Sequence, residues 1–239
     1  MNIHIGPQSK EKFRQENLAK LGKYKALFWV IFLVGPLTLI ALNKFHLIKP
    51  WVIRNDGQGS VALVITDGGT GSAFNVSSTA WITAQHVIRN LSGGDGVELQ
   101  LTISKINHNI DAKIKYQSAD ENLDFAFLKT TGDYSNADQH FTLSDFNNVS
   151  LGDEVIIIGY PAGIYSYAKS QVINLGFSEN PNLFLMAGNA WPGNSGGPIV
   201  HSKTGEVIGV LIAGFENEYK GMVVGLKINE VKNSLEQQQ

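Results

Sequence analysis

The chain contains no cysteine among its 239 residues. That absence excludes disulfide bonds, thiolate metal sites and a cysteine nucleophile together. The 6 histidines are scattered and none belongs to an HExxH pair, so no metal site is predicted. A net charge of −2 and the lack of a basic face in the folded part also argue against a nucleic-acid partner.

The hydrophobic content of 43% is that of a globular chain, neither disordered nor fibrous. The length leaves room for one domain of about 180–190 residues and an appendage. A domain of that size buries a substantial core without disulfide bonds.

Charged residues are missing from residues 26–43, which read ALFWVIFLVGPLTLIALN. As a helix this run would span about 27 Å at roughly 1.5 Å per residue, close to the thickness of the hydrocarbon core. A buried core helix and a cleaved signal peptide are the alternatives. The run is apolar on every face and ends without an A-x-A-like cleavage site, so an uncleaved transmembrane helix is favoured.

The two flanks of this predicted span differ in charge. Residues 1–25 form a basic tail, and fewer positive residues follow in the linker, residues 44–59. The positive-inside rule places the amino terminus in the cytoplasm and the rest of the chain outside, in the periplasm or the extracellular space. Residues 60–239 are then the exported domain, and the lipid bilayer is a predicted partner through residues 26–43.

Short apolar runs rich in β-branched residues recur from Ser60 onward, separated by clusters of Gly, Asn and Asp. About a dozen such runs predict strands, at residues 60–66, 71–76, 79–84, 97–103, 111–117, 124–129, 154–160, 168–177, 182–187, 198–202, 206–215 and 221–228. Almost no helical periodicity interrupts them, which predicts an all-β sandwich or barrel. Only residues 229–237 are predicted to be helical.

The strongest local signal is the sequence WPGNSGGPIV at residues 191–200. A serine hydroxyl is a poor nucleophile unless a base removes its proton, and the attacked carbonyl needs donors for its oxyanion. Glycines before Ser195 let the N–H groups of Gly193 and Ser195 point into one hole. A glycine-rich turn without function is the alternative. The G-x-S-x-G elbow of α/β hydrolases is rejected, because a strand-like run follows the serine and the only later histidine, His201, is too close.

Two further residues stand where a catalytic base and its partner are needed. His86 lies on a short turn after an apolar strand, and the run at 71–74 is the predicted hairpin partner of that strand. A histidine with a purely structural role is the alternative. Asp124 enters a strongly apolar strand, where a partly buried carboxylate needs a partner. Orienting a histidine would supply one. Asp120 and Glu121 are rivals on the polar side of the boundary, and a strand-edge cap is the other role open to Asp124.

Together, the strings TAQHVI, ENLDFAFLK and GNSGGPIV resemble trypsin-like peptidases, most of all the bacterial HtrA/Deg branch. The resemblance covers about residues 60–235. It implies two six-stranded antiparallel β-barrels with a catalytic triad between them, His86 and Asp124 from the first and Ser195 from the second. It also implies an oxyanion hole formed by the backbone of Gly193 and Ser195, with Asn194 as a further candidate, and no metal or organic cofactor.

Two features depart from the HtrA pattern. No PDZ domain follows in this sequence, so peptide sensing by such a domain is not expected. Trp191 and Pro192 precede the oxyanion turn, where HtrA proteases have smaller or polar residues. Proline restricts the backbone there, which fixes the hole either in its active shape or in another.

The resemblance implies a substrate pocket walled by Asn189, Ala190, Trp191, Ala213, Gly214, Phe215 and Val223. No acidic residue occupies its expected floor, where a buried carboxylate would favour Lys or Arg. Cleavage after small or medium apolar residues is therefore predicted.

The predicted function is a serine endopeptidase that hydrolyses exported or membrane proteins through an acyl-enzyme intermediate. Its predicted partners are protein or peptide substrates. A protease-like binding module, catalytically silent or activated by a partner, is the main alternative, and an esterase or other acyl transferase is another. The complete set of three catalytic residues argues against the silent module.

Overall fold

The computed structural model describes residues 59–103, 106–120, 122–131, 140–176, 180–214 and 221–237. They belong to one compact unit, Lys49–Gln239. The predicted basic tail, the predicted membrane span at 26–43 and nearly all of the predicted linker lie outside the described residues. Among the residues that the structure describes, no helix is long and apolar enough to cross a bilayer.

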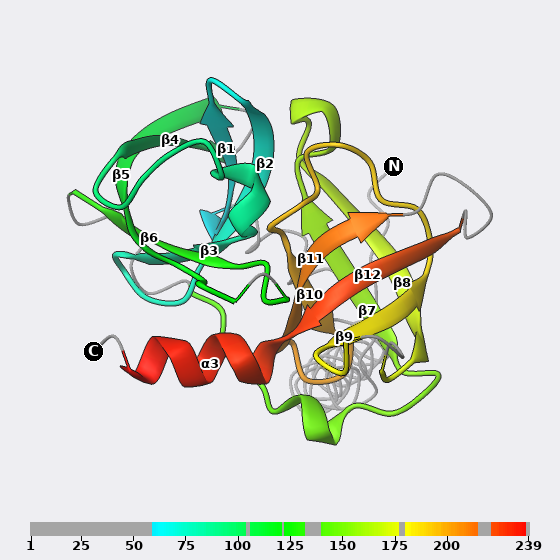
Figure 1. Cartoon of the computed structure of the whole chain (residues 1–239). Helices are drawn as coiled ribbons and strands as arrows, with labels where there is room; N and C mark the ends of the chain where they lie inside the picture. The colour runs from blue at the N-terminus through cyan, green and yellow to red at the C-terminus, as the bar shows by residue number, and fades with distance from the viewer. Residues whose placement is uncertain are drawn as a thin grey trace, which may run out of the picture. The chain divides into compact units, whose positions relative to one another are not determined.

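Twelve strands form two closed antiparallel barrels of six strands each (Figure 1). The first barrel has the strand order β1-β2-β3-β6-β5-β4 and consists of β1 (Val61–Thr66), β2 (Gly69–Asn75), β3 (Ala80–Thr83), β4 (Gly96–Ile103), β5 (Ile106–Gln117) and β6 (Ala126–Thr130). The second has the order β10-β11-β12-β9-β8-β7 and consists of β7 (Glu154–Gly159), β8 (Ser166–Asn174), β9 (Leu183–Ala187), β10 (Pro198–His201), β11 (Val207–Gly214) and β12 (Met222–Lys227). The predicted pair of six-stranded barrels is confirmed.

Four helical segments complete the described part of the chain, of which three are single 3-10 turns. These are η2 (Gln85–Val87), η3 (Phe146–Asn148) and η4 (Pro161–Gly163), and the one α-helix is α3 (Ile228–Gln237). The predicted carboxy-terminal helix is confirmed, one residue longer at its start. Strand β5 begins at Ile106, before the predicted start at 111, because the polar stretch preceding Asp111 pairs with β4 along its full length.

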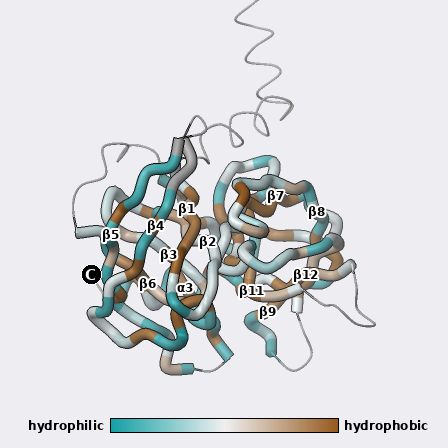
Figure 2. Tube along the Cα trace, turned by 90° about the horizontal axis from the view of Figure 1, so that it is seen from above, coloured by the Kyte–Doolittle hydropathy of each residue, from teal (hydrophilic) through white to brown (hydrophobic). Residues whose placement is uncertain are grey.

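Strand β1 of the first barrel is buried on both of its faces, which explains the unbroken run of apolar residues in it. Ala62 and Val64 point into the core of the first barrel, while Val61 and Leu63 join a larger cluster that continues into the second barrel. Strand residues point alternately to the two faces of a sheet, so a strand with both faces covered is apolar throughout. Hydrophobic segments run along β1 and β3 and along β7 (Figure 2). The two barrels therefore pack tightly, and residues at their contact are held from both sides.

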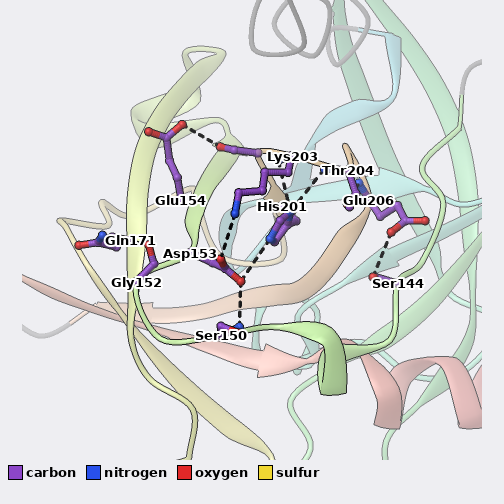
Figure 3. Close-up of polar contacts among 11 residues, drawn as sticks. Ser144, Ser150, Gly152, Asp153, Glu154, Gln171, His201, Lys203, Thr204 and Glu206 are labelled. Carbon is purple, nitrogen blue, oxygen red and sulfur yellow. Dashed lines mark hydrogen bonds and ion pairs between the residues drawn. The ribbon is translucent and has the colours of Figure 1, made fainter. Parts of the chain in front are cut away.

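A polar cluster fixes the beginning of β7 in the second barrel (Figure 3). The carboxylate of Asp153 accepts a hydrogen bond from the Ser150 N–H at 2.8 Å and faces Nε2 of the buried His201 at 3.3 Å. Nδ1 of His201 accepts from the backbone N–H groups of Lys203 and Thr204, so Nε2 carries the proton. His201 therefore has a structural place in β10. The cluster anchors the start of a strand whose other end leads to the candidate active site.

Candidate active site

His86 lies on η2, the turn that follows β3, and contacts Asp124 through two of its atoms. Nδ1 of its ring is 2.5 Å from Oδ2 of Asp124, and its backbone N–H donates to Oδ1 at 2.9 Å. Because a carboxylate can only accept, Nδ1 carries the proton and Nε2 is left as the basic nitrogen. The rival Asp120 instead accepts from the N–H groups of Asn122 in its own loop.

The segment before Ser195 is a tight turn that its proline suits. The Asn194 N–H donates to the Trp191 carbonyl at 3.0 Å, and Gly193 has a φ of 100°. A type II turn needs a positive φ at its third residue and favours proline at its second, which here is Pro192. A Cβ on Gly193 would also lie 2.2 Å from the carbonyl oxygen of Tyr160, so only glycine fits.

Two backbone N–H groups around Ser195 remain available for a ligand. Those of Asn194, Gly196 and Gly197 each donate to a backbone carbonyl. Those of Gly193 and Ser195 have no acceptor among the residues that the structure describes. Two unpaired N–H groups, separated by one intervening residue, form the arrangement that stabilises an oxyanion. The N–H of Asn194, the further predicted candidate, closes the turn and is not one of these two unpaired groups.

The direction of the Gly193 N–H is set from outside the turn. The carbonyl of Pro192, which belongs to the same peptide unit, accepts from the N–H of Ala162 at 3.0 Å. The C=O and N–H of a trans peptide point in opposite directions, so holding the carbonyl also orients the N–H. Ala162 lies on η4 with a φ of 51°, the one positive φ of a non-glycine residue among those described.

Ser72 of the first barrel joins both of these loops. It is fully buried in β2, and its hydroxyl donates to the Gly193 carbonyl at 2.7 Å and accepts from the Tyr160 N–H at 2.9 Å. Its backbone N–H donates to the Ser195 carbonyl at 2.7 Å. Sequence reasoning noted the run at 71–74 only as a hairpin partner and missed this hydroxyl. The sequence feature that could have indicated this hydroxyl is a serine inside an apolar strand.

Glycines bring Ser195 beside the strand that precedes His86. A Cβ on Gly196 would lie 2.8 Å from the backbone nitrogen of Ala84, and one on Gly71 would lie 2.5 Å from Val87 and 3.1 Å from the Ser195 carbonyl. Among the described residues no hydrogen bond joins the Ser195 hydroxyl to His86. Such bonds are often long without substrate and tighten in the Michaelis complex.

The predicted pocket residues are only partly gathered. Ala190 lies against Gly214, where a Cβ would come within 3.1 Å of the Ala190 Cβ. Val223 is fully buried, and its side chain would lie 3.8 Å from a Cβ on Gly188. The other predicted pocket residues are not gathered with these. Asn189 and Ala213 are exposed, Trp191 is 67% exposed, and Phe215 lies outside the described residues. No cluster of three or more His, Cys, Asp or Glu side chains suited to a metal ion occurs in the described ranges.

Comparisons with known proteins agree with this geometry. The model of the trypsin-like peptidase domain matches residues 71–210. A similar curated protein is the serine protease HtrA-like of Staphylococcus aureus (strain bovine RF122 / ET3-1), 27% identical over 182 residues, which are 69% of this chain and 22% of that protein. The chain thus spans less than a quarter of that relative's length.

Solved structures share the fold. The crystal structure of Deg5 is 24% identical with a TM-score of 0.62, over 77% of this chain and 91% of that one. An inactive form of Rv3671c from M. tuberculosis H37Rv is 19% identical with a TM-score of 0.59, over 75% and 86% of the two chains. The family model covers more than half of the sequence, and the chain therefore belongs to the trypsin-like peptidase family.

Proposed function

We propose that this chain is a membrane-anchored serine endopeptidase in which Ser195 is the nucleophile, His86 the general base and Asp124 the residue that orients the histidine. The observation that carries the proposal is the double contact of Asp124 with the ring and the backbone N–H of His86. That contact leaves Nε2 basic, as the removal of a serine proton requires.

Acylation would proceed by attack of the Ser195 hydroxyl oxygen on the carbonyl carbon of the scissile peptide bond, with the hydroxyl proton passing to Nε2 of His86. The negative charge of the tetrahedral intermediate would fall on the former carbonyl oxygen, which the N–H groups of Gly193 and Ser195 would stabilise. The proton on Nε2 then passes to the leaving nitrogen as the C–N bond breaks. A water molecule then attacks the carbonyl carbon of the acyl-enzyme while Nε2 of His86 takes its proton. The Ser195 oxygen leaves and takes that proton back, which restores the free enzyme.

The proposed substrates are exported or membrane proteins cut after small or medium apolar residues. The contact between Ala190 and Gly214 and the burial of Val223 support a small, apolar pocket. In a peptide library, the residue before the cut should be enriched in Ala and Val. A strict preference for Lys or Arg would overturn the proposed specificity while leaving the nucleophile untouched.

The proposed topology keeps residues 1–25 in the cytoplasm, spans the membrane with residues 26–43 and exports residues 60–239 through the linker at 44–59. It rests on the apolar, uncharged run and on the excess of positive charge before it. Chain that remains in the membrane pellet after alkaline carbonate washing, with residues 60–239 open to protease from outside, would support it. Release by the wash would contradict an uncleaved anchor.

The activity is tested with the full chain in detergent, unfolded casein and a fluorophosphonate probe. We expect the wild type to cleave casein and take up the probe, and Ser195→Ala to do neither although it unfolds at the same temperature. Probe labelling without cleavage of any protein would favour an esterase. A folded wild type that takes up no probe would favour a binding module or a protease that needs an activating partner.

A further inference from the structure

Three lysines stand together on the outer face of the first barrel, outside the candidate active site. Lys113 and Lys115 lie on β5, Lys129 lies on β6, and all three are exposed. Strand register places Lys113 directly opposite Lys129, where like charges destabilise the pairing. No side chain of the three forms a hydrogen bond or an ion pair within the described part of the chain. Three cations are therefore held together without a partner.

A cavity of about 630 Å³ opens beside these lysines. Strand β6 and helix α3 border it, and Figure 1 shows α3 running beneath the first barrel. Its lining combines two of the lysines with hydroxyl groups and an apolar wall, from Lys115, Lys129, Ser77, Thr79, Ala80, Tyr116, Phe127, Leu128 and Leu235. Cationic groups above an apolar wall fit a ligand that has an anionic head and an apolar body. We call these residues, together with Lys113, the lysine cavity.

Carboxylates on the same elements do not neutralise the lysine cavity. Lys129 has Ala80 and Lys113 as its two strand neighbours, so no acid faces it across the sheet. Asp111 precedes Lys113 on the same face of β5 and lies opposite Glu98 of β4, while Glu230 and Glu236 lie on α3. None of these acids forms an ion pair with the three lysines. The site remains electropositive.

The chain enters the barrel beside the lysine cavity. The Ser60 carbonyl accepts a hydrogen bond from the Asn75 N–H at 3.0 Å, and the turn that follows Asn75 supplies Ser77 and Thr79 to the lining. The described chain therefore begins beside this turn. In the proposed topology the linker and the membrane anchor precede it in the sequence, so the lysine cavity lies on the side of the barrel where the chain that leads to the anchor begins.

We propose that the lysine cavity binds the head groups of anionic phospholipids in the bilayer that anchors the chain. The inference rests on the proposed anchor for its choice of a membrane rather than a soluble ligand. Each lysine close to an anionic bilayer contributes about a fivefold preference for it. Salt screens such contacts, so the docking weakens as ionic strength rises. The barrel would then be held at a fixed orientation to the membrane, with a defined reach for substrates.

The experiment uses the full chain in lipid nanodiscs, and the lack of native cysteine allows a single label. Thr79→Cys, in the lining, carries an environment-sensitive fluorophore, and Ser150→Cys, exposed on the second barrel, is the matched control. Discs contain phosphatidylcholine alone or with phosphatidylglycerol. We expect a blue shift at position 79 only in the anionic discs, reversed by high salt. The label at position 150 should not change.

Charge variants test whether the lysines are responsible. Lys113→Gln, Lys115→Gln and Lys129→Gln together should abolish the shift. Removing charges from the second barrel instead, through Lys169→Gln and Lys203→Gln, should leave it intact. A shift that persists in the triple variant would overturn the proposal.

Two other outcomes also count against lipid binding. A shift caused by a soluble acidic, apolar peptide in neutral discs, but not by anionic discs, would make the lysine cavity a peptide site. A chain that inserts normally yet shows no difference between the two discs would refute the inference and leave the anchor in place. A chain that enters no disc would instead refute the anchor, and flotation with phosphatidylglycerol vesicles would then test the lysine cavity by itself, absence of flotation refuting it.

Discussion

The hydroxyl of Ser72 donates a hydrogen bond of 2.7 Å to the carbonyl of Gly193, 121 residues further along the chain. The first barrel thereby holds the turn that carries the proposed nucleophile, which belongs to the second barrel. Ser72→Ala should lower kcat about tenfold and leave KM nearly unchanged, because leaving a buried carbonyl without its donor costs roughly 1–3 kcal/mol and this carbonyl belongs to the turn that presents the oxyanion donors.

Ser118→Ala is the matched control for that substitution, since Ser118 is also a buried serine of the first barrel but contacts Asp120 in its own loop. Both variants should lose similar stability on urea unfolding. If their kcat values fall equally, Ser72 acts only through stability and the positioning role is refuted.

The backbone N–H of Ala162 should be needed for activity, whereas its side chain should not. Ala162→Gly keeps the bond to the Pro192 carbonyl and removes the strain of a positive φ, so full activity and a small gain in stability are expected. Ala162→Pro removes the donor and fixes φ near −65°, against an observed 51°. Its uptake of a fluorophosphonate should fall at least tenfold.

Thermal unfolding of both variants decides whether the turn or the whole fold is affected. A proline variant that unfolds like the wild type but reacts slowly would establish that the Ala162 N–H orients the turn before Ser195. Equal reactivity of the glycine and proline variants would show that the Gly193 N–H keeps its direction without Ala162.

Asp124→Asn should separate orientation from proton transfer. An amide can present its NH₂ group to Nδ1 and so favour the wrong tautomer of His86, and kcat should drop about ten-thousandfold. A variant within tenfold of the wild type would contradict the assigned roles.

Acidification should weaken the contacts of the polar cluster at the start of β7. Burial raises the pKa of Asp153, but the hydrogen bond from the Ser150 N–H and the contact with His201 outweigh it and hold the pKa below its ordinary value of 3.8. A lowered pKa means that the ionised group stabilises the folded state above pH 4 and that this contribution is lost as the pH falls further.

Urea unfolding measures this effect directly. Asp153→Asn should unfold about 1 kcal/mol more easily at pH 7, and the difference should shrink below pH 4. Asp111→Asn, at an exposed site on β5, should resemble the wild type at both pH values. A difference that stays constant with pH would refute the ionic contribution of Asp153.

Strand positions were predictable from the sequence because packing on both faces makes residues 61–65 of β1 and 126–128 of β6 apolar. The start of β5 was not, since its polar residues gain their strand conformation from pairing with β4, which local preference does not encode. The contact of Ser72 with Gly193 was equally hidden, because no short-range pattern tells which strand meets a turn of the other barrel. The lysine cavity was missed for the same reason: register joins Lys113 and Lys129 across two strands.

The division of the site between two barrels has a consequence for synthesis. All six strands of the first barrel, which carries the proposed base His86, precede Ser195 in the chain. The second barrel carries the proposed nucleophile, and the turn that bears it gains its hydrogen bond from Ser72 only when the two barrels meet. Under the proposed mechanism neither half cuts alone, so the chain is unable to digest itself or its neighbours until both halves have folded and met.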